Sequence, residues 1–114
     1  MSQALAAAGF TSLSAVLVTG VGASFPTSGC CKFGIQVVLA GSPATAVATL
    51  EGTLDTDNDD TKNHWVTLVT WDVGSQTSGD ILFVVDKPVA KIRANCTTLT
   101  TGTGKTVTAK LSAV

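Results

Sequence analysis

Small apolar and polar side chains alternate through the segment from Thr45 to Trp71. Between Ala46 and Leu54 every second position is Ala, Leu or Gly, and the positions between them carry Val, Thr or Glu. Because successive strand side chains point to opposite faces, this pattern predicts a half-buried strand. The acidic segment Asp55–Asp60 and a second apolar run ending at Trp71 follow. The whole stretch therefore predicts a β-hairpin with a long polar connection.

Further runs with strand character are separated by turns rich in Gly, Pro, Ser and Asp. Outside the small-residue N-terminus no window has a sustained apolar repeat at helical spacing, and the strands recur at roughly ten to fifteen residues. We therefore expect an all-β fold, an antiparallel β-sandwich of about seven to eight strands. The runs are a possible first strand at Ser12–Val21, and strands at Phe33–Ala40, Asp80–Val85, Val89–Thr97 and Thr106–Ser112.

The alternation within these strands also predicts which residues form the core. In a two-layer sandwich the inward faces of both sheets pack against each other. We expect Leu50, Ile92 and Leu111 to lie inside. Their neighbours in the chain should point outward, namely Glu51, Arg93 and Lys110.

The first 29 residues contain no charged side chain. A signal peptide would begin with positive charge, and a membrane-spanning helix would need about 18–20 apolar residues without the Ser, Thr and Gly found here. We interpret Met1–Phe10 as an extended N-terminal arm, suited to lying against a neighbouring subunit. The predicted organisation is thus an arm with a possible first strand over residues 1–29 and a sandwich domain over residues 30–114.

Length and charge limit the possible functions. The 114 residues fit one domain, and only 13% of them are charged, against about 25% in ordinary soluble domains. So few charges indicate a surface that partners cover. The formal net charge of -1 gives no electrostatic footprint for nucleic acid, and the absence of Tyr leaves few stacking platforms for bases or sugars.

The sequence contains no catalytic constellation and no metal-binding spacing. Cys30, Cys31 and Cys96 are odd in number and two are adjacent, which favours reduced thiols made in a reducing cytoplasm. No C-x2-4-C spacing supports zinc. His64 is the only histidine and is expected at the surface. We expect no enzyme activity and no cofactor.

The acidic segment Asp55–Asp60 admits two interpretations. Alternating oxygen ligands suit calcium, but Asp60 stands where a helix-loop-helix calcium loop needs Gly, and Val66 stands where it needs Glu. A solvated hairpin loop is the favoured interpretation, and no metal site is predicted.

The second strand of the hairpin is apolar on both faces. Trp65, Val69 and Trp71 share one face of a regular strand, either as an exposed strip for a ligand or partner or, as we favour, as core. Val66 and Leu68 make the other face apolar, so the strand is either central in its sheet or covered by another chain. The candidate partner-binding residues are Met1, Leu5, Phe10, Trp65, Val69 and Trp71.

The segments 48–55 (ATLEGTLD) and 64–68 (HWVTL) resemble a strand pair of small virion proteins from tailed bacteriophages. Those proteins often continue with strands like Val89–Asn95 and Val107–Leu111, so the resemblance covers about residues 45–112. Here the connection between the paired strands is longer and more acidic than the family's usual short one.

This resemblance implies a phage β-sandwich protein of the capsid cementing or decoration type. Such a protein would bind across subunits of the major capsid protein and to copies of itself, as a homo-oligomer on the capsid surface after synthesis in the host cytoplasm. A tail or head-tail connector component is the alternative within the particle. The rival from another class is a carbohydrate- or cell-surface-binding sandwich that uses the two Trp as a platform. Nucleic acid and membrane are not expected partners.

Overall fold

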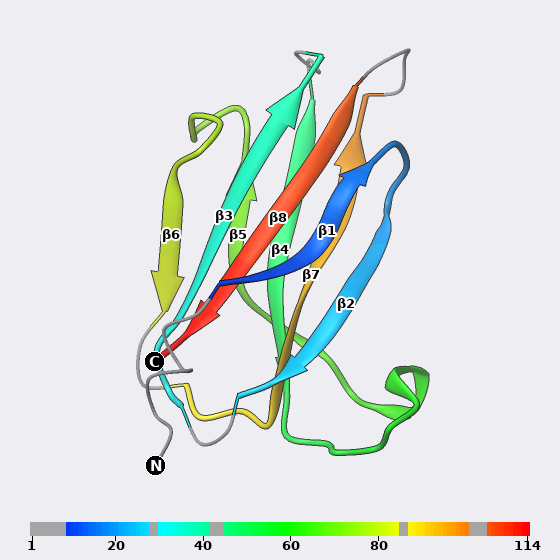
Figure 1. The fold of residues 1–114 in the computed structure, drawn as a ribbon, viewed down its shortest axis with the longest axis vertical. Coiled ribbons are helices and arrows are strands. Elements are labelled where there is room, and N and C mark those ends of the chain that lie inside the picture. Colours follow the sequence, from blue (N-terminus) through cyan, green and yellow to red (C-terminus); the bar gives the residue numbers. More distant parts are fainter. Residues whose placement is uncertain (1–8, 28–29, 42–44, 85–86, 101–104) are drawn as a thin grey trace.

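The chain folds into two antiparallel sheets in the computed structural model, which describes residues 9–27, 30–41, 45–84, 87–100 and 105–114. Figure 1 shows the strands and a short 3-10 turn, η2 (Asp60–Lys62). The strands are β1 (Phe10–Val16), β2 (Gly20–Pro26), β3 (Phe33–Ala40), β4 (Ala46–Thr53), β5 (Val66–Asp72), β6 (Ile81–Val84), β7 (Lys91–Leu99) and β8 (Thr106–Ala113).

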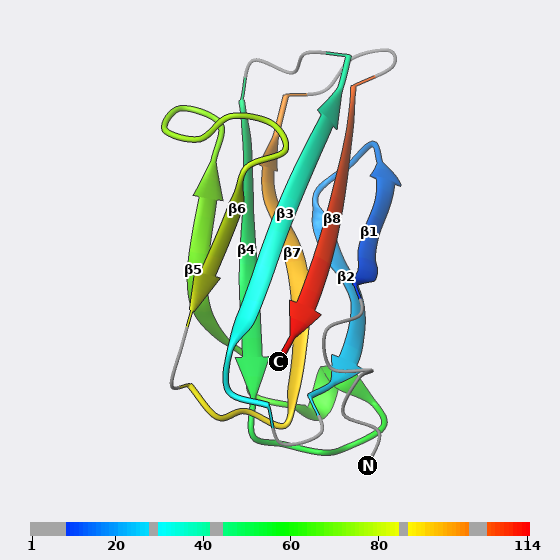
Figure 2. The ribbon, with the colours of Figure 1, turned by 60° about the vertical axis from the view of Figure 1, so that its left-hand side comes forward.

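The strand order is β1-β8-β3-β6 in one sheet and β2-β7-β4-β5 in the other. Figure 2 shows the two sheets packed face to face. The predicted all-β sandwich is confirmed, and so is the pairing of β4 with β5 as a hairpin within one sheet. No helix among the described residues is long and apolar enough to cross a membrane.

The core lies between the inward faces of the two sheets. Leu50, Ile92 and Leu111 are at most 1% exposed, so the predicted inner positions are confirmed. The adjacent side chains of Glu51 and Arg93 lie on the outer face and form an ion pair, with Nε donating to Oε1 over 2.8 Å. The alternation with a period of two residues therefore separates core from surface on these strands.

The N-terminal region differs from its prediction. Residues 12–21, expected as one strand, belong to two strands, β1 and β2, which lie in opposite sheets and pair with β8 and β7. The chain reverses between them at Gly20, whose φ of 150° suits a residue without a Cβ. Phe10, expected in the arm, begins β1 and stacks on Phe25 with ring centroids 4.4 Å apart. Residues 10–26 thus supply an edge strand to each sheet.

Ser12 and Gly22 mark the point where β1 and β2 come closest. A Cβ at Gly22 would lie 2.1 Å from the carbonyl oxygen of Ser12, so only glycine fits. The Ser12 hydroxyl donates to the carbonyl of Ala23 (2.7 Å) and accepts from the N–H of Ala94 (2.9 Å). This buried hydroxyl ties β1 of one sheet to β2 and β7 of the other.

A β-bulge at Leu68 reverses the faces of the sheet towards which the side chains at the start of β5 point. Leu50 pairs with Val69, but the next residue, Glu51, pairs with Thr67, so Leu68 is an extra residue in the ladder. Beyond the bulge the faces are exchanged. Trp71 is fully buried, whereas Trp65 lies on the outer face, so the prediction that they share a face is wrong.

Two other predictions for the hairpin need correction. Leu54, expected inside, is 76% exposed, because β4 ends at Thr53 and the alternation ends with it. Strand β5 is the edge strand of its sheet, so the alternative that it is central is wrong, and the alternative that another chain covers it stays a prediction.

The acidic loop after β4 is exposed over residues 56–59, as the solvated interpretation predicts, but its end is anchored to the sheet. Figure 1 shows it turning back beneath the sheet towards β2. The Ser24 hydroxyl of β2 donates to Asp60 Oδ2 over 2.5 Å, and Lys91 of β7 donates to Asp60 Oδ1 over 3.1 Å. Asn63 is buried within the loop and donates to the Asp57 carbonyl. The loop is therefore a packed part of the structure, anchored to two strands.

Candidate interaction surfaces

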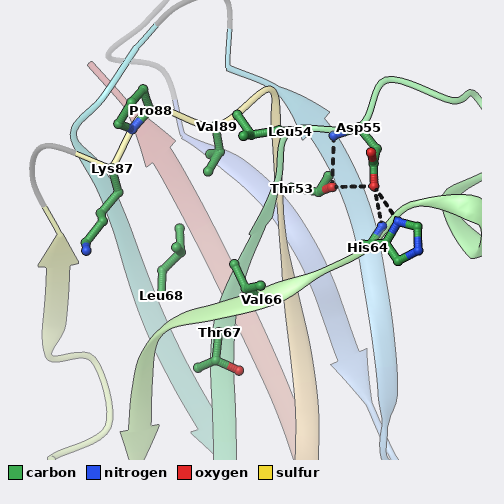
Figure 3. Close-up of a pocket in the computed structure, with 10 residues that line it drawn as sticks. All are labelled: Thr53, Leu54, Asp55, His64, Val66, Thr67, Leu68, Lys87, Pro88 and Val89. Carbon is green, nitrogen blue, oxygen red and sulfur yellow. Dashed lines mark hydrogen bonds and ion pairs between the residues drawn. The ribbon is translucent and has the colours of Figure 1, made fainter.

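An open groove runs beside the first half of β5 and has a volume of about 530 Å³. Figure 3 shows that its walls come from the end of β4, the start of β5 and the connection between β6 and β7. Most of the lining is apolar, and Leu54 and Val66 are both largely exposed there. The lining residues are Thr53, Leu54, Asp55, His64, Val66, Thr67, Leu68, Lys87, Pro88 and Val89.

Gly52 allows the floor of this groove to form. A Cβ at Gly52 would lie 2.9 Å from Leu68 Cδ1 and 3.0 Å from Val89 Cγ1, so these two side chains occupy the space above the glycine. Leu68 reaches this position because it is the bulge residue of β5. The bulge and the glycine together place two half-buried aliphatic side chains at the open edge of the sandwich.

Charged side chains stand on opposite sides of the groove. Asp55 Oδ2 accepts from the backbone N–H of His64 over 2.5 Å and lies 3.0 Å from His64 Nδ1. These contacts hold the pKa of Asp55 below its usual value, the backbone hydrogen bond being the largest cause. Figure 3 shows Lys87 across the groove from this pair. An occupant would thus meet an apolar floor between a carboxylate and an ammonium group.

Trp65 and Arg93 form a second structured surface, on the outer face of the β2-β7-β4-β5 sheet. Arg93 Cζ lies 4.0 Å from the centroid of the indole, a cation–π geometry, and the Trp65 Nε1–H donates to the Asp60 carbonyl over 3.0 Å. Glu51 accepts from both Arg93 and Asn95. Trp65 therefore serves to fix the acidic loop against the sheet.

The carboxylates of Asp57 and Asp59 bind the loop itself. Asp57 Oδ1 accepts from the N–H of Asp59, and Asp59 Oδ1 accepts from the N–H and hydroxyl of Thr61. Among the described residues there is no group of three or more Asp, Glu, His or Cys side chains arranged to hold a metal ion. The calcium interpretation therefore gains no support from the geometry.

The three cysteines are free thiols, as expected from their spacing. Cys96 is buried in the core, and burial raises the pKa of its thiol. Cys30 and Cys31 are half-buried, just before β3.

The four predicted partner-binding residues that the structure describes do not form one surface. Met1 and Leu5 lie outside the described residues, and Phe10 stacks on Phe25 at the start of β1. Val69 packs against the core. The core interpretation is confirmed for Trp71 and wrong for Trp65. Because the two indoles face opposite sides of the sheet, they cannot form a shared platform for a sugar.

Sequence reasoning missed the groove, although one signal for it was present. The apolar character of Val66 and Leu68, on the face opposite to Trp71 in a regular strand, indicated a covered surface. Recognising the groove also required Lys87 and Val89, which the chain brings there from the connection after β6. That contact joins segments far apart in the sequence, so no local sequence pattern predicts it.

Comparison with known proteins supports the fold. No protein-family model and no curated protein sequence matches the chain. Among solved structures, the crystal structure of the SPBc2 prophage-derived protein YomS is similar, with a TM-score of 0.60 and 10% sequence identity. The similarity covers 94% of this chain and 92% of that one. At this low identity the likeness concerns the sandwich architecture alone, over almost the full length of both chains.

Proposed function

We propose that this chain is a structural protein of a bacteriophage particle, which decorates or cements the capsid shell by binding across subunits of the major capsid protein. Two independent likenesses support a phage protein. The strand motifs of residues 45–112 resemble small virion proteins, and the whole fold is similar to a prophage-derived protein.

The observation that carries the binding role is the groove beside β5. An extended segment of a capsid subunit can lie along β5 with its apolar side chains in the groove, so that burial of apolar surface, and not strand addition, provides the contact. Leu54 and Val66 would then be removed from water, at about 25 cal/mol for each Å² of apolar surface buried. Lys87 and Asp55 would select the charges of the bound segment. Each copy contributes a small stabilising free energy to the shell, and the contributions of many copies add up.

Reconstitution on particles tests this proposal. Purified protein is mixed with phage particles that lack it, and binding is measured by co-sedimentation and electron cryomicroscopy. We expect added density on the outer capsid shell at regular positions. Density confined to the tail or the head-tail junction would overturn the capsid role, and the chain would then be a tail or connector component of the particle. Absence of binding to any part of the particle would overturn the whole proposal.

A pair of matched variants tests the groove. Val66→Glu places a charge on its apolar floor, and we expect roughly tenfold or more weaker particle binding, equivalent to about 1.4 kcal/mol. Val21→Glu is the control, because Val21 on β2 is 54% exposed, close to the 58% of Val66, and lies at the opposite edge of the same sheet. Equal binding by the two variants would exclude the groove as the contact.

A further inference from the structure

Strand β6 forms a free edge of the β1-β8-β3-β6 sheet. Its four residues, Ile81–Val84, are all apolar. They pair with β3 in unbroken antiparallel register, from Phe33 opposite Val84 to Gln36 opposite Ile81. In Figure 1 no described segment lies beside β6 on the side away from β3, and β5 of the other sheet is its neighbour across the sandwich. The backbone groups of this edge are therefore available for pairing.

The other three edge strands carry the devices that prevent strand addition. The ladders of β1, β2 and β5 each contain a register shift, and β2 ends in Pro26. Natural sheets use bulges, prolines and charged residues to keep their edges from pairing with another chain. Among the strands that the structure describes, β6 alone has an edge without any of these, which marks it as an edge that accepts a partner.

The outward side chains of β6 are unusually exposed for their size. Ile81 is 62% and Phe83 72% exposed, whereas Leu82 and Val84 turn towards the core. Phe83 lies opposite Gly34, which has no side chain to cover the ring. Beside Ile81 and Gly34 the sheet has a shallow hollow of about 210 Å³. A partner at this edge would cover two large apolar side chains as well as the backbone.

The charges at the two ends of β6 are complementary to those of a second, antiparallel copy. Asp80 precedes the strand and is exposed. Lys87 lies beyond the other end, near Lys32, since the Lys87 N–H donates to the carbonyl of Cys31. Among the described residues, these two lysines give that end a positive charge. Antiparallel pairing of two copies brings each Asp80 to the positive end of the other.

We propose that β6 pairs with β6 of a second copy, so that the two β1-β8-β3-β6 sheets join into one continuous sheet. The pair would be related by a two-fold axis perpendicular to that sheet. Directly opposed residues of an antiparallel pair must lie on the same face. If Leu82 lies opposite its own equivalent, Ile81 faces Phe83 and Val84 faces Asp80; if Phe83 does, Leu82 faces Val84. The dimer depends on the proposed function in one respect, namely that it would be the unit that assembles on the particle.

The test uses the purified full chain without particles. Its mass is measured by light scattering and sedimentation velocity over a range of concentrations. We expect a reversible dimer for the wild type and a monomer for Ile81→Lys and Phe83→Lys. Because both side chains are exposed, the thermal midpoints of the variants should equal that of the wild type at concentrations where it is monomeric. Val21→Lys, on the protected edge strand β2, is the control and should stay dimeric. Wild-type protein that is monomeric at all concentrations would overturn the proposal.

A second measurement applies if the variants fail to fold or if the dimer forms through another surface of the chain. In hydrogen exchange we expect the amides of Ile81–Val84 to be more protected at dimer-forming concentrations than under dilution. A dimer that shows no such protection, or that persists in folded Phe83→Lys, would overturn pairing through β6. Particle binding is measured separately, so a failed dimer and a failed virion role give different results.

Discussion

Trp65 and Trp71 face opposite sides of the β2-β7-β4-β5 sheet, because the bulge at Leu68 exchanges the faces of β5 between them. Trp71 is fully buried, and Trp65 lies under the guanidinium of Arg93. One strand thus supplies both a core indole and the indole that anchors the acidic loop.

The two indoles should differ greatly in their contribution to stability. We expect Trp71→Ala to lower the free energy of unfolding by about 3–5 kcal/mol, because it leaves a large cavity. Trp65→Ala removes a half-buried ring and a cation–π contact that is worth about 0.5–1 kcal/mol, so its effect should be clearly smaller. Denaturant unfolding measures both. Equal losses would contradict the assignment of the two faces.

Fluorescence gives a separate check of the same relationship. Trp71→Phe should be tolerated, because within the described residues the indole N–H of Trp71 has no hydrogen-bond partner. It leaves only Trp65 to emit, while Trp65→Phe leaves only Trp71. We expect acrylamide to quench the Trp71→Phe protein more strongly than the Trp65→Phe protein. The reverse order would place Trp71 at the surface.

Much of the fold could be predicted because alternation with a period of two residues is a local property. Leu50 and Ile92 were placed in the core from the residues beside them. The bulge at Leu68 could not be predicted in this way, since it depends on how β5 pairs with β4. The same holds for the anchoring of the acidic loop. Its own sequence does not show that Asp60 contacts Ser24 and Lys91.

The candidate surfaces show the same division. The apolar run from Val66 to Leu68 indicated a covered strand, but its groove needs Lys87 and Val89 from another connection. Strand β6 is an exposed edge because of the order of the strands in its sheet. The sequence of Ile81–Val84 alone does not determine that order. Local patterns therefore predicted most of the strands, though not the division of residues 12–21 between β1 and β2, and contacts between distant segments created the surfaces.

Leu50 and Leu54 provide a matched pair for testing where the alternation ends. Leu50 is 0% and Leu54 76% exposed, although both belong to the same sequence pattern. We expect Leu50→Ala to cost about 2–5 kcal/mol of stability through lost burial and a cavity. Leu54→Ala should stay within about 0.5 kcal/mol of the wild type. Chemical denaturation distinguishes them, and similar costs would show that the register of β4 is wrong.

Gly22 should tolerate no side chain. A Cβ there would meet the Ser12 carbonyl oxygen at 2.1 Å, and a backbone group between two sheets cannot move aside without breaking the Ser12 bridge. We expect Gly22→Ala to lower the thermal midpoint strongly. Gly9→Ala is the control, because its Cβ would lie 3.8 Å from the nearest atom, the Leu111 carbonyl oxygen. A normal midpoint for Gly22→Ala would show that β1 and β2 are farther apart.

Asp60 should make the anchoring of the acidic loop dependent on pH. The Ser24 hydroxyl and then Lys91 hold the pKa of Asp60 below its usual value of 3.8. A carboxyl group with a lowered pKa in the folded state stabilises that state above the unfolded pKa of about 3.9. This contribution is lost as the pH falls through the folded pKa, because the unfolded chain then binds a proton more readily.

Asp60→Asn tests this sign. The variant should be less stable than the wild type at neutral pH, and the difference should shrink as the pH falls below about 4. Stability is measured by thermal unfolding at a series of pH values. Asp72→Asn, at the end of β5, controls for the loss of one negative charge, because the Asn Oδ1 can still accept the hydrogen bond from the Gly74 N–H. If the wild type and Asp60→Asn lose stability in parallel throughout the acid range, Asp60 does not hold the loop to β2 and β7 through its charge.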